Sequence, residues 1–190
     1  MKTKNPLFDE RRTAEAAVCL LWLAGGSLPI IKLMKLLYLA ERLSLQRYGV
    51  PITGDKLVSM PHGPVLSMTY ELIQGMPSAP GGWEDWISAR ENHQVALADS
   101  RRIRSLEDLR HLCDADLETL EDIWREFGHM KPFDLVDYTH NNCPEWRDPH
   151  GSSRPISYGD LFNAVGYTPE QARIMADELK AQQYIAATFA

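Results

Sequence analysis

The amino-acid sequence predicts an α+β fold: a mainly helical single domain wrapped around a small antiparallel sheet of about three strands. Apolar residues recur at helical spacing in several long segments, most clearly over residues 30–48. Short extended runs lie between these segments, at residues 56–60, 83–90 and 94–98. A chain of 190 residues can bury one substantial core. We therefore expect an N-terminal arm at residues 1–12, and then one domain over residues 13–190 that ends in a helix.

The segment from Ile30 to Tyr48 is predicted to be the central helix. Apolar side chains cover most of its circumference, which is typical of a helix that is buried on most sides. Gly49 is a candidate left-handed C-cap, because glycine adopts positive φ without a Cβ penalty. Beyond a short strand, His62, Gly63 and Pro64 predict a strand-to-helix joint, with Pro64 in the first turn of the next helix.

Capping signals predict the other helices. Thr13 is expected to cap a helix over residues 14–24. A short helix over residues 132–139 is expected to direct Phe133 into the core. Further helices are expected to begin after Ser105, Ser157 and Thr168, and the last of them is expected to run to about residue 187.

The extended runs at residues 83–90 and 94–98 are predicted to form a hairpin with its turn at residues 91–93. Successive side chains of a strand point to opposite faces, so Trp83 and Trp86 would lie on opposite sides of the sheet. At most one of them would then be buried in a one-sided sheet. An exposed tryptophan is a candidate partner-binding residue, because tryptophan is enriched at interface hot spots.

Composition and charge limit the class of protein. A formal net charge of −6 and a pI near 5.5 argue against a general nucleic-acid binder. Cys19, Cys113 and Cys143 are an odd number of cysteines at wide spacings, as is typical of a reducing cytosol. The longest apolar run near the N-terminus, residues 16–24, is far shorter than the ~20 residues of a membrane span. We therefore expect a cytoplasmic protein without a signal peptide or a membrane contact.

The pair of His140 and Cys143 raises the question of a zinc site or a nucleophile. The sequence offers neither the second ligand pair that zinc needs nor an orienting group for a thiolate. We therefore predict no catalytic residue, no metal, no cofactor and no enzymatic activity. The structural alternative is that His140 caps the helix before it, and that Trp146 packs its loop with the indole N–H on a backbone acceptor. A hydrolase that used Cys143 would lose its function in Cys143→Ser, whereas the structural interpretation predicts little change.

Lys32, Lys35 and Arg42 form a basic stripe on the central helix. Two interpretations are open: a solvated or carboxylate-paired edge, and a contact surface for an acidic partner or a nucleic acid. Under the second, charge reversal at Lys35 and Arg42 would weaken partner binding and leave the melting temperature nearly unchanged. Tyr38 and Tyr70 are expected either to hydrogen-bond across the joint or to form ordinary aromatic core. A second basic cluster comprises Arg101, Arg102 and Arg104.

Two blocks of the sequence resemble the Panacea antitoxin-domain family, which includes the SocA-like antitoxins and the GepA-like phage-associated proteins. The first block reads KLLYLAERLSLQRYG, a proline, ITGD, and then HGPV and TYELI. The second reads IWREFGHMKPFDLVDYTHNNCPEW. Together they span roughly residues 28–146 in the family's order. The matching motif residues are expected to be structural: Tyr38, Gly49, His62, Gly63, Pro64, Tyr70, His140 and Trp146.

The resemblance implies an antitoxin of a two-gene toxin–antitoxin module, from a bacterium or a phage. Members of the family neutralise a cognate toxin by direct protein–protein binding, so the implied partner is a toxin from a neighbouring gene, held in a hetero-oligomer. Two alternatives remain open: an adaptor that delivers the toxin to a cellular protease, and a DNA-binding autoregulator of its own operon. The residues that we expect to bind the partner are Lys32, Lys35, Arg42, Trp83 and Trp86.

Overall fold

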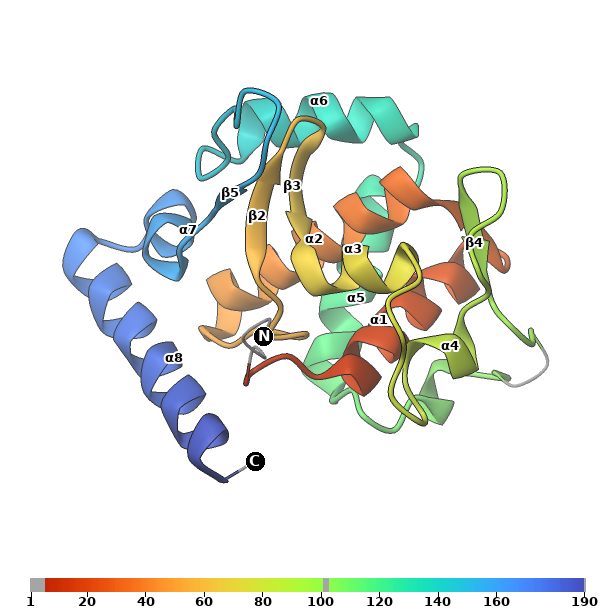
Figure 1. Cartoon of the computed structure of the whole chain (residues 1–190). Helices are drawn as coiled ribbons and strands as arrows, with labels where there is room; N and C mark the ends of the chain where they lie inside the picture. The colour runs from red at the N-terminus through yellow and green to blue at the C-terminus, as the bar shows by residue number, and fades with distance from the viewer. Residues whose placement is uncertain (1–5, 101–102, 190) are drawn as a thin grey trace.

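The computed structural model describes residues 6–100 and 103–189, and it confirms the mainly helical α+β fold (Figure 1). Its helices are α1 (Glu10–Leu23), α2 (Ile30–Tyr48), α3 (Ser67–Ile73), α4 (Trp83–Trp86), α5 (Asp114–Phe127), α6 (Pro132–Asn142), α7 (Tyr158–Ala164) and α8 (Pro169–Phe189), with a 3-10 turn at Leu106–Asp108. Its strands are β1 (Ser27–Pro29), β2 (Leu57–Met60), β3 (Gly63–Leu66), β4 (Gln94–Ala96) and β5 (Arg154–Pro155). No helix of the described residues is long and apolar enough to cross a membrane.

Helix α2 is the centre of the core, as its apolar circumference predicts. It packs against α1, α5, α6 and the β2–β3 hairpin, and the hairpin stands across it in Figure 1. Its largest fully buried side chains include Leu33, Leu36 and Leu37. Gly49 closes the helix with φ +70°, and its N–H donates to the Leu45 carbonyl over 3.0 Å, which confirms the predicted C-cap.

The strands form two small antiparallel sheets. One has the order β3-β2-β5, and the other pairs β1 with β4. The predicted strand at residues 56–60 is confirmed as β2. The predicted strand at residues 83–90 is wrong in its first part, which is helix α4, whereas Ile87 pairs with Leu97 antiparallel as the predicted hairpin requires. Glu10 explains the difference: its carboxylate accepts the amides of Ala79 and Trp83 and so shapes the turn from outside the segment. The turn before β4 is confirmed, since Glu91 pairs with Gln94.

Two helix starts also differ from the prediction. The first helix begins at Glu10, because the Asp9 carboxylate caps it by accepting the amides of Arg11 and Arg12 over 3.0 and 3.1 Å. Thr13 lies inside that helix, with its hydroxyl on the Asp9 carbonyl. The third helix begins at Ser67 rather than at Pro64. The capping residues Ser157 and Thr168 are confirmed, since their hydroxyls accept the amides of Asp160 and Gln171.

A buried carboxylate on α2 holds the chain that follows the helix. Glu41 is fully buried, and its Oε2 accepts the amides of Ile52 and Thr53, each over 2.9 Å. Its Oε1 accepts the Thr53 hydroxyl over 2.9 Å and the Gly54 amide over 3.0 Å. Burial raises the pKa of Glu41 to about 7, and the hydrogen bonds from Thr53 and Gly54 oppose that rise. The carboxylate therefore replaces the secondary structure that residues 52–54 lack.

A second buried carboxylate, Asp55, caps α3. It accepts the amides of Met68 and Thr69, both over 2.8 Å, and the Thr69 hydroxyl over 2.7 Å. It also accepts the amide of Lys56 over 2.6 Å. Because Asp55 satisfies the first free amides of α3 from a distant position, no local N-cap is needed, and the helix begins three residues beyond Pro64.

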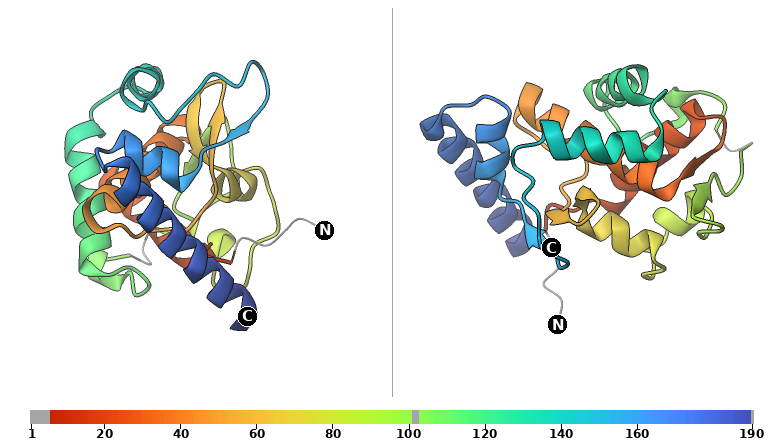
Figure 2. Two further views of the ribbon diagram at one scale, coloured as in Figure 1. Left: turned by 90° about the vertical axis from the view of Figure 1, so that its left-hand side faces the viewer. Right: turned by 90° about the horizontal axis from the view of Figure 1, so that it is seen from above.

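The C-terminal pair α7–α8 lies beside the rest of the domain. In Figures 1 and 2, α8 runs along one side of the molecule next to α7. Ala172, Ala176 and Leu179 bury its first half, whereas Tyr184 and Ile185 on its second half are exposed.

Replacing Glu41 by Gln is expected to lower the free energy of unfolding by about 2–3 kcal/mol, because the new amide N–H₂ would face donors instead of accepting from them. The measurement is urea-induced unfolding at pH 8, where the native carboxylate is ionised. Glu178→Gln is the matched control, an exposed glutamate in α8 that should be neutral. Equal stability of the Glu41 and Glu178 variants would contradict this role for Glu41.

Candidate partner-binding groove

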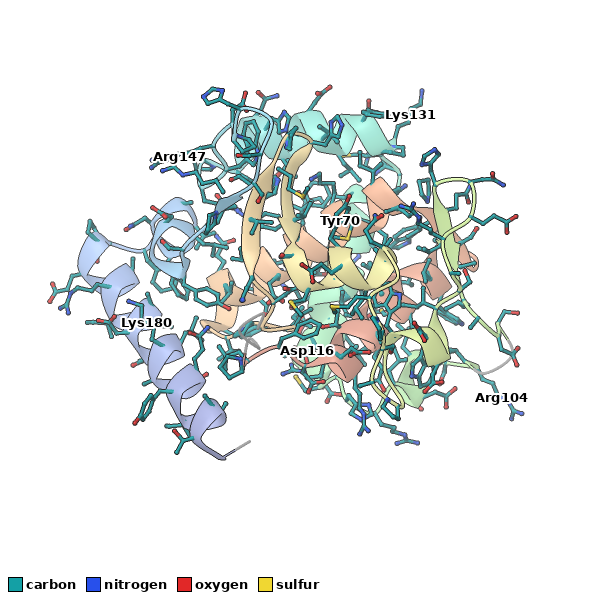
Figure 3. The ribbon with its side chains drawn as sticks, in the orientation of Figure 1. Tyr70, Arg104, Asp116, Lys131, Arg147 and Lys180 are labelled. Atoms are coloured by element: carbon teal, nitrogen blue, oxygen red, sulfur yellow. The ribbon has the colours of Figure 1, made fainter. Side chains whose placement is uncertain are left out.

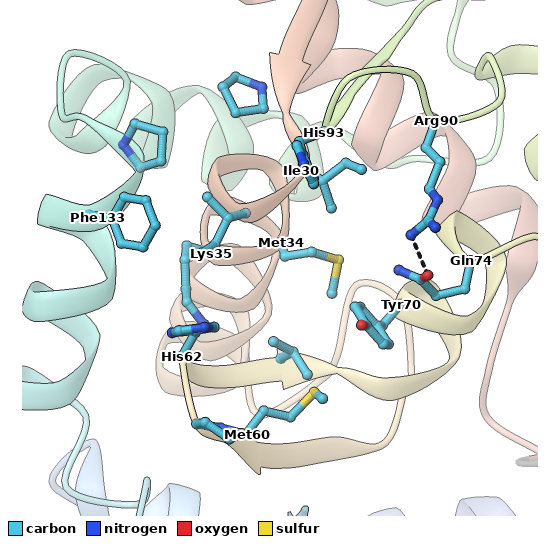
Figure 4. Close-up of a pocket in the computed structure, with 15 residues that line it drawn as sticks. Ile30, Met34, Lys35, Met60, His62, Tyr70, Gln74, Arg90, His93 and Phe133 are labelled. Atoms are coloured by element: carbon cyan, nitrogen blue, oxygen red, sulfur yellow. Dashed lines mark hydrogen bonds between the residues drawn. The ribbon is translucent and has the colours of Figure 1, made fainter. Parts of the chain in front are cut away.

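An apolar groove of about 600 Å³ lies between the N-terminal end of α2, the β2–β3 hairpin, α3 and the N-terminal end of α6 (Figure 4). Its apolar lining includes Ile30, Ile31, Met34, Met60, Val65 and Phe133. Its polar lining consists of Lys35, His62, Gln74, Arg90 and His93 together with the Tyr70 hydroxyl. This volume, with a mostly apolar lining and a few polar groups, is typical of a binding site.

The β4 turn forms one edge of the groove. Asn92 and His93 adopt φ +49° and +61°, which reverses the chain between Glu91 and Gln94. The His93 carbonyl accepts the amide of Ile30 over 2.9 Å. This bond satisfies one of the amides that the first turn of a helix leaves free, and so it fixes the β4 turn against the start of α2.

The β2–β3 turn forms the opposite edge, and Gly63 is required there. Gly63 has φ +93°, and a Cβ atom at this position would lie 2.7 Å from Thr139 Oγ1 and 2.9 Å from Lys35 Nζ. The predicted strand-to-helix joint is wrong, because Met60 pairs with Gly63 and Pro64 lies within β3. The joint is a turn between two strands. The ring of His62 at its tip meets the ring of Phe133 edge to face, with the centroids 6.4 Å apart.

Lys35 lies inside the molecule and not on an exposed basic stripe. Only 1% of the residue is exposed, and Nζ donates to the Pro64 carbonyl over 2.8 Å. Figure 4 shows its side chain running along the groove wall toward His62. Burial lowers the pKa of Lys35 to about 7, because desolvation disfavours the charged amine. The prediction that Lys35 contributes to a surface stripe is therefore wrong.

The other two cations of the stripe also have internal partners. Lys32 Nζ donates to the Gly128 carbonyl over 2.6 Å and lies 5.6 Å from the ring centroid of Trp124. Arg42 Nε pairs with Glu145 Oε1 over 2.7 Å. This ion pair agrees with the interpretation of the stripe as a carboxylate-paired edge. Charge reversal at Lys35 and Arg42 would therefore report on folding, and we no longer expect it to leave the melting temperature unchanged. Partner binding through these cations stays a prediction without support from their contacts.

The two tryptophans of the predicted strand belong to α4 instead. Trp83 is buried, and Trp86 is half-buried against the core. They do not lie on opposite faces of a sheet, because Trp83–Trp86 is one helical turn. Trp83 also lines a second hollow of about 500 Å³ together with residues of α3. Trp86 is the more accessible of the two, because it is half-buried whereas Trp83 is buried. Binding of a partner by these tryptophans stays a prediction.

Tyr38 and Tyr70 have separate roles. The Tyr38 hydroxyl donates to Glu145 Oε1 over 2.8 Å, on the same oxygen that Arg42 reaches, and burial raises the pKa of Tyr38. Tyr70 lines the groove, and Figure 3 places it at the centre of the face that the hairpin and α3 form. The predicted hydrogen bond across the joint is therefore replaced by a bond from Tyr38 to the α6–β5 loop.

Trp146 packs its loop as predicted, and its indole N–H donates to the Met60 carbonyl over 3.0 Å. His140 stacks on the Trp146 ring with the centroids 4.0 Å apart. It does not cap α6, because the helix continues to Asn142 and Cys143 is its C-cap residue. Burial raises the pKa of Cys143 to about 12, so the thiolate that nucleophilic attack requires is disfavoured. Within residues 6–100 and 103–189, no group of three or more His, Cys, Asp or Glu side chains could hold a metal.

Several groove residues were not expected from the sequence. Arg90, Gln74 and His93 come from loops and a helix end, and Arg90 Nη1 donates to Gln74 Oε1 across the groove mouth (Figure 4). Phe133 is 65% exposed on the rim, so the prediction that it points into the core is wrong. Its place after Pro132, in the first turn of α6, leaves it beyond the part of the helix that contacts the body. Of the second basic cluster, Arg101 and Arg102 lie outside the described residues.

Replacing Lys35 by Met is expected to remove a pH dependence of stability between pH 7 and 8.5. The native amine with a pKa of about 7 has lost its proton in this range, while the unfolded amine, with its usual pKa of 10.5, keeps it. Since the unfolded state binds more protons, the free energy of unfolding of the wild type should rise by about 1–2 kcal/mol between pH 7 and pH 8.5, relative to that of Lys35→Met. Urea unfolding at the two pH values measures the difference. Lys180→Met, at an exposed lysine, should keep the wild-type slope; the same slope in Lys35→Met would refute the account.

Comparison with known proteins identifies the chain by its family. The model of the SocA-like antitoxin, Panacea domain, matches residues 33–147, which is more than half of the chain. Neither the curated proteins nor the solved structures gave a match. The matched segment contains Glu41, Asp55, the β2–β3 hairpin and most of the groove, whereas α7 and α8 lie beyond it. The chain therefore belongs to the SocA-like antitoxin family that the Panacea domain defines.

Proposed function

We propose that this protein is the antitoxin of a two-gene module and that it neutralises its cognate toxin by direct binding. The observation that carries the proposal is the match of residues 33–147 to an antitoxin domain. The groove supports a binding role, because it is preformed by the core and lies largely within the matched segment. Neutralisation would follow if the bound toxin's active site is covered or held in an inactive form.

We also propose that the protein acts as a binder and not as a catalyst. The pair that raised the catalytic alternative is His140 and Cys143, and its contacts are structural: His140 stacks on Trp146, and the pKa of the Cys143 thiol is raised. The absence of an activated nucleophile at this pair favours a binding protein. Cys143→Ser should therefore leave neutralisation intact.

Regulation by DNA binding has less support than toxin binding. Helices α2 and α3 are separated by the β2–β3 hairpin, so they do not form a helix-turn-helix. Arg104, Lys131, Arg147 and Lys180 lie at separate places around the molecule in Figure 3, and the net charge of the chain is −6. A DNA-binding protein would ordinarily collect such cations on one face.

Co-expression with the adjacent gene tests the proposal. The adjacent gene product alone is expected to stop growth, and co-expression of this protein is expected to restore it. Affinity purification of this protein, with a tag at its N-terminus, should recover the toxin in a stable complex.

The level of toxin distinguishes direct neutralisation from delivery to a protease. Rescue with an unchanged amount of toxin supports direct binding, whereas rescue with loss of the toxin favours the proteolytic adaptor. A neighbour that is not toxic and does not co-purify would contradict the antitoxin proposal.

A further inference from the structure

We infer that the groove binds an apolar segment of the cognate toxin that carries a carboxylate group. The inference rests on the proposed function and names the surface and the chemistry by which the toxin is held. It follows from three features of the groove: its charge, its apolar wall and the orientation of one arginine.

The charge of the groove is opposite to the charge of the whole chain. Asp and Glu outnumber Lys and Arg by 26 to 20 in the sequence, yet among the described residues no Asp or Glu lines the groove. The acidic neighbours Glu71 and Glu91 do not line it either. Its ionisable lining consists instead of Lys35, Arg90 and two histidines, apart from the phenol of Tyr70. An anionic group is therefore favoured in this groove, and a cationic group is disfavoured.

The apolar wall favours an occupant with a large apolar side chain. Met34 and Met60 face the hollow from α2 and β2 (Figure 4), and methionine adapts its shape to different apolar groups. Phe133 stands on the rim with 65% of its surface exposed, held edge to face by His62. An exposed aromatic beside an apolar hollow is typical of an interface anchor. Phe133 contributes little to the core, so its ring is available to a partner.

Arg90 is oriented to receive the carboxylate. Its Nη1 donates to Gln74 Oε1 at the groove mouth, which fixes one side of the guanidinium (Figure 4). The remaining N–H donors of an arginine suit a carboxylate, which they bind through two parallel hydrogen bonds. Lys35, whose amine is bound to the Pro64 carbonyl, lends further positive potential to the wall when it is protonated. The groove thus joins an apolar anchor site to an anion site at its mouth.

A nucleic acid fits this surface less well than a peptide does. Phosphates need a row of exposed cations, whereas here one exposed arginine borders an apolar hollow. A peptide segment supplies both required groups, an apolar side chain and a carboxylate, within a few residues.

Arg90→Glu and Phe133→Ala test the inference in the complex with the toxin. Each is expected to weaken toxin binding at least about ten-fold, because charge repulsion or loss of the anchor acts at the interface. The melting temperature should stay near the wild-type value, since both residues are exposed. Arg110→Glu is the matched control: an exposed arginine outside the groove, whose reversal should leave the affinity unchanged.

A pair of fluorescent probes tests the chemistry of the groove without the toxin. Anilinonaphthalene sulfonate is apolar and anionic, and N-phenyl-1-naphthylamine is its neutral counterpart. Wild-type protein is expected to bind both. Arg90→Glu should weaken the anionic probe at least about ten-fold and leave the neutral probe nearly unchanged. Phe133→Ala should weaken both probes.

Loss of toxin binding in Arg90→Glu and Phe133→Ala, with the predicted probe pattern, supports the inference. Toxin binding that stays intact in both variants overturns the groove as the docking site and leaves the antitoxin function standing. No probe binding, or equal loss of both probes in Arg90→Glu, overturns the proposed anion site. If the wild-type protein forms no complex with the toxin, the proposed function is contradicted, and so is the inference that the toxin occupies the groove.

Discussion

Two buried carboxylates, Glu41 and Asp55, fix the chain on either side of the β2–β3 hairpin. Glu41 gathers the amides of residues 52–54 onto α2, and Asp55 caps α3 on the far side of the β2–β3 hairpin. Burying a carboxylate is costly unless its oxygens accept hydrogen bonds, and the oxygens of both carboxylates do. The hairpin between the two anchor points therefore has one position on the helix. The groove takes its shape from that position.

The same hairpin positions two polar groups of the groove, Lys35 and His62. The Pro64 carbonyl meets Lys35 of α2, and Gly63 leaves the space that the lysine and Thr139 occupy. Burial lowers the pKa of Lys35, and its amine is held in the groove wall by the bond to the Pro64 carbonyl. The β4 turn is tied to the start of α2 through the His93 carbonyl. A surface fixed at both edges loses little conformational entropy when a partner binds, which suits the binding role that we propose.

The parts of the fold that depend on local sequence could be predicted, and the parts that depend on distant residues could not. The period of α2 and its end at Gly49 are local signals, and both are confirmed. Residues 83–86 form helix α4 and not the predicted strand, because the Glu10 carboxylate accepts the amide of Trp83. Pro64 lies in a strand and not in a helix, because Asp55, which is distant in the sequence, caps α3 at a later position. The groove is lined by residues from five separate segments, so no single stretch of the sequence predicts it. A lysine on a helix is ordinarily exposed, so the sequence alone predicts a surface position for Lys35 and not the buried one that the structure shows.

The central claim is that the two carboxylates hold the hairpin as part of the cooperative core. Amide hydrogen exchange tests it most directly, because the acceptors are side chains and the donors are individual N–H groups. The account predicts that the amides of Thr53, Gly54 and Thr69 exchange as slowly as that of Leu37 within α2, through global unfolding. If these amides exchange quickly while Leu37 stays protected, the hairpin opens on its own, and a groove preformed by buried carboxylates is contradicted.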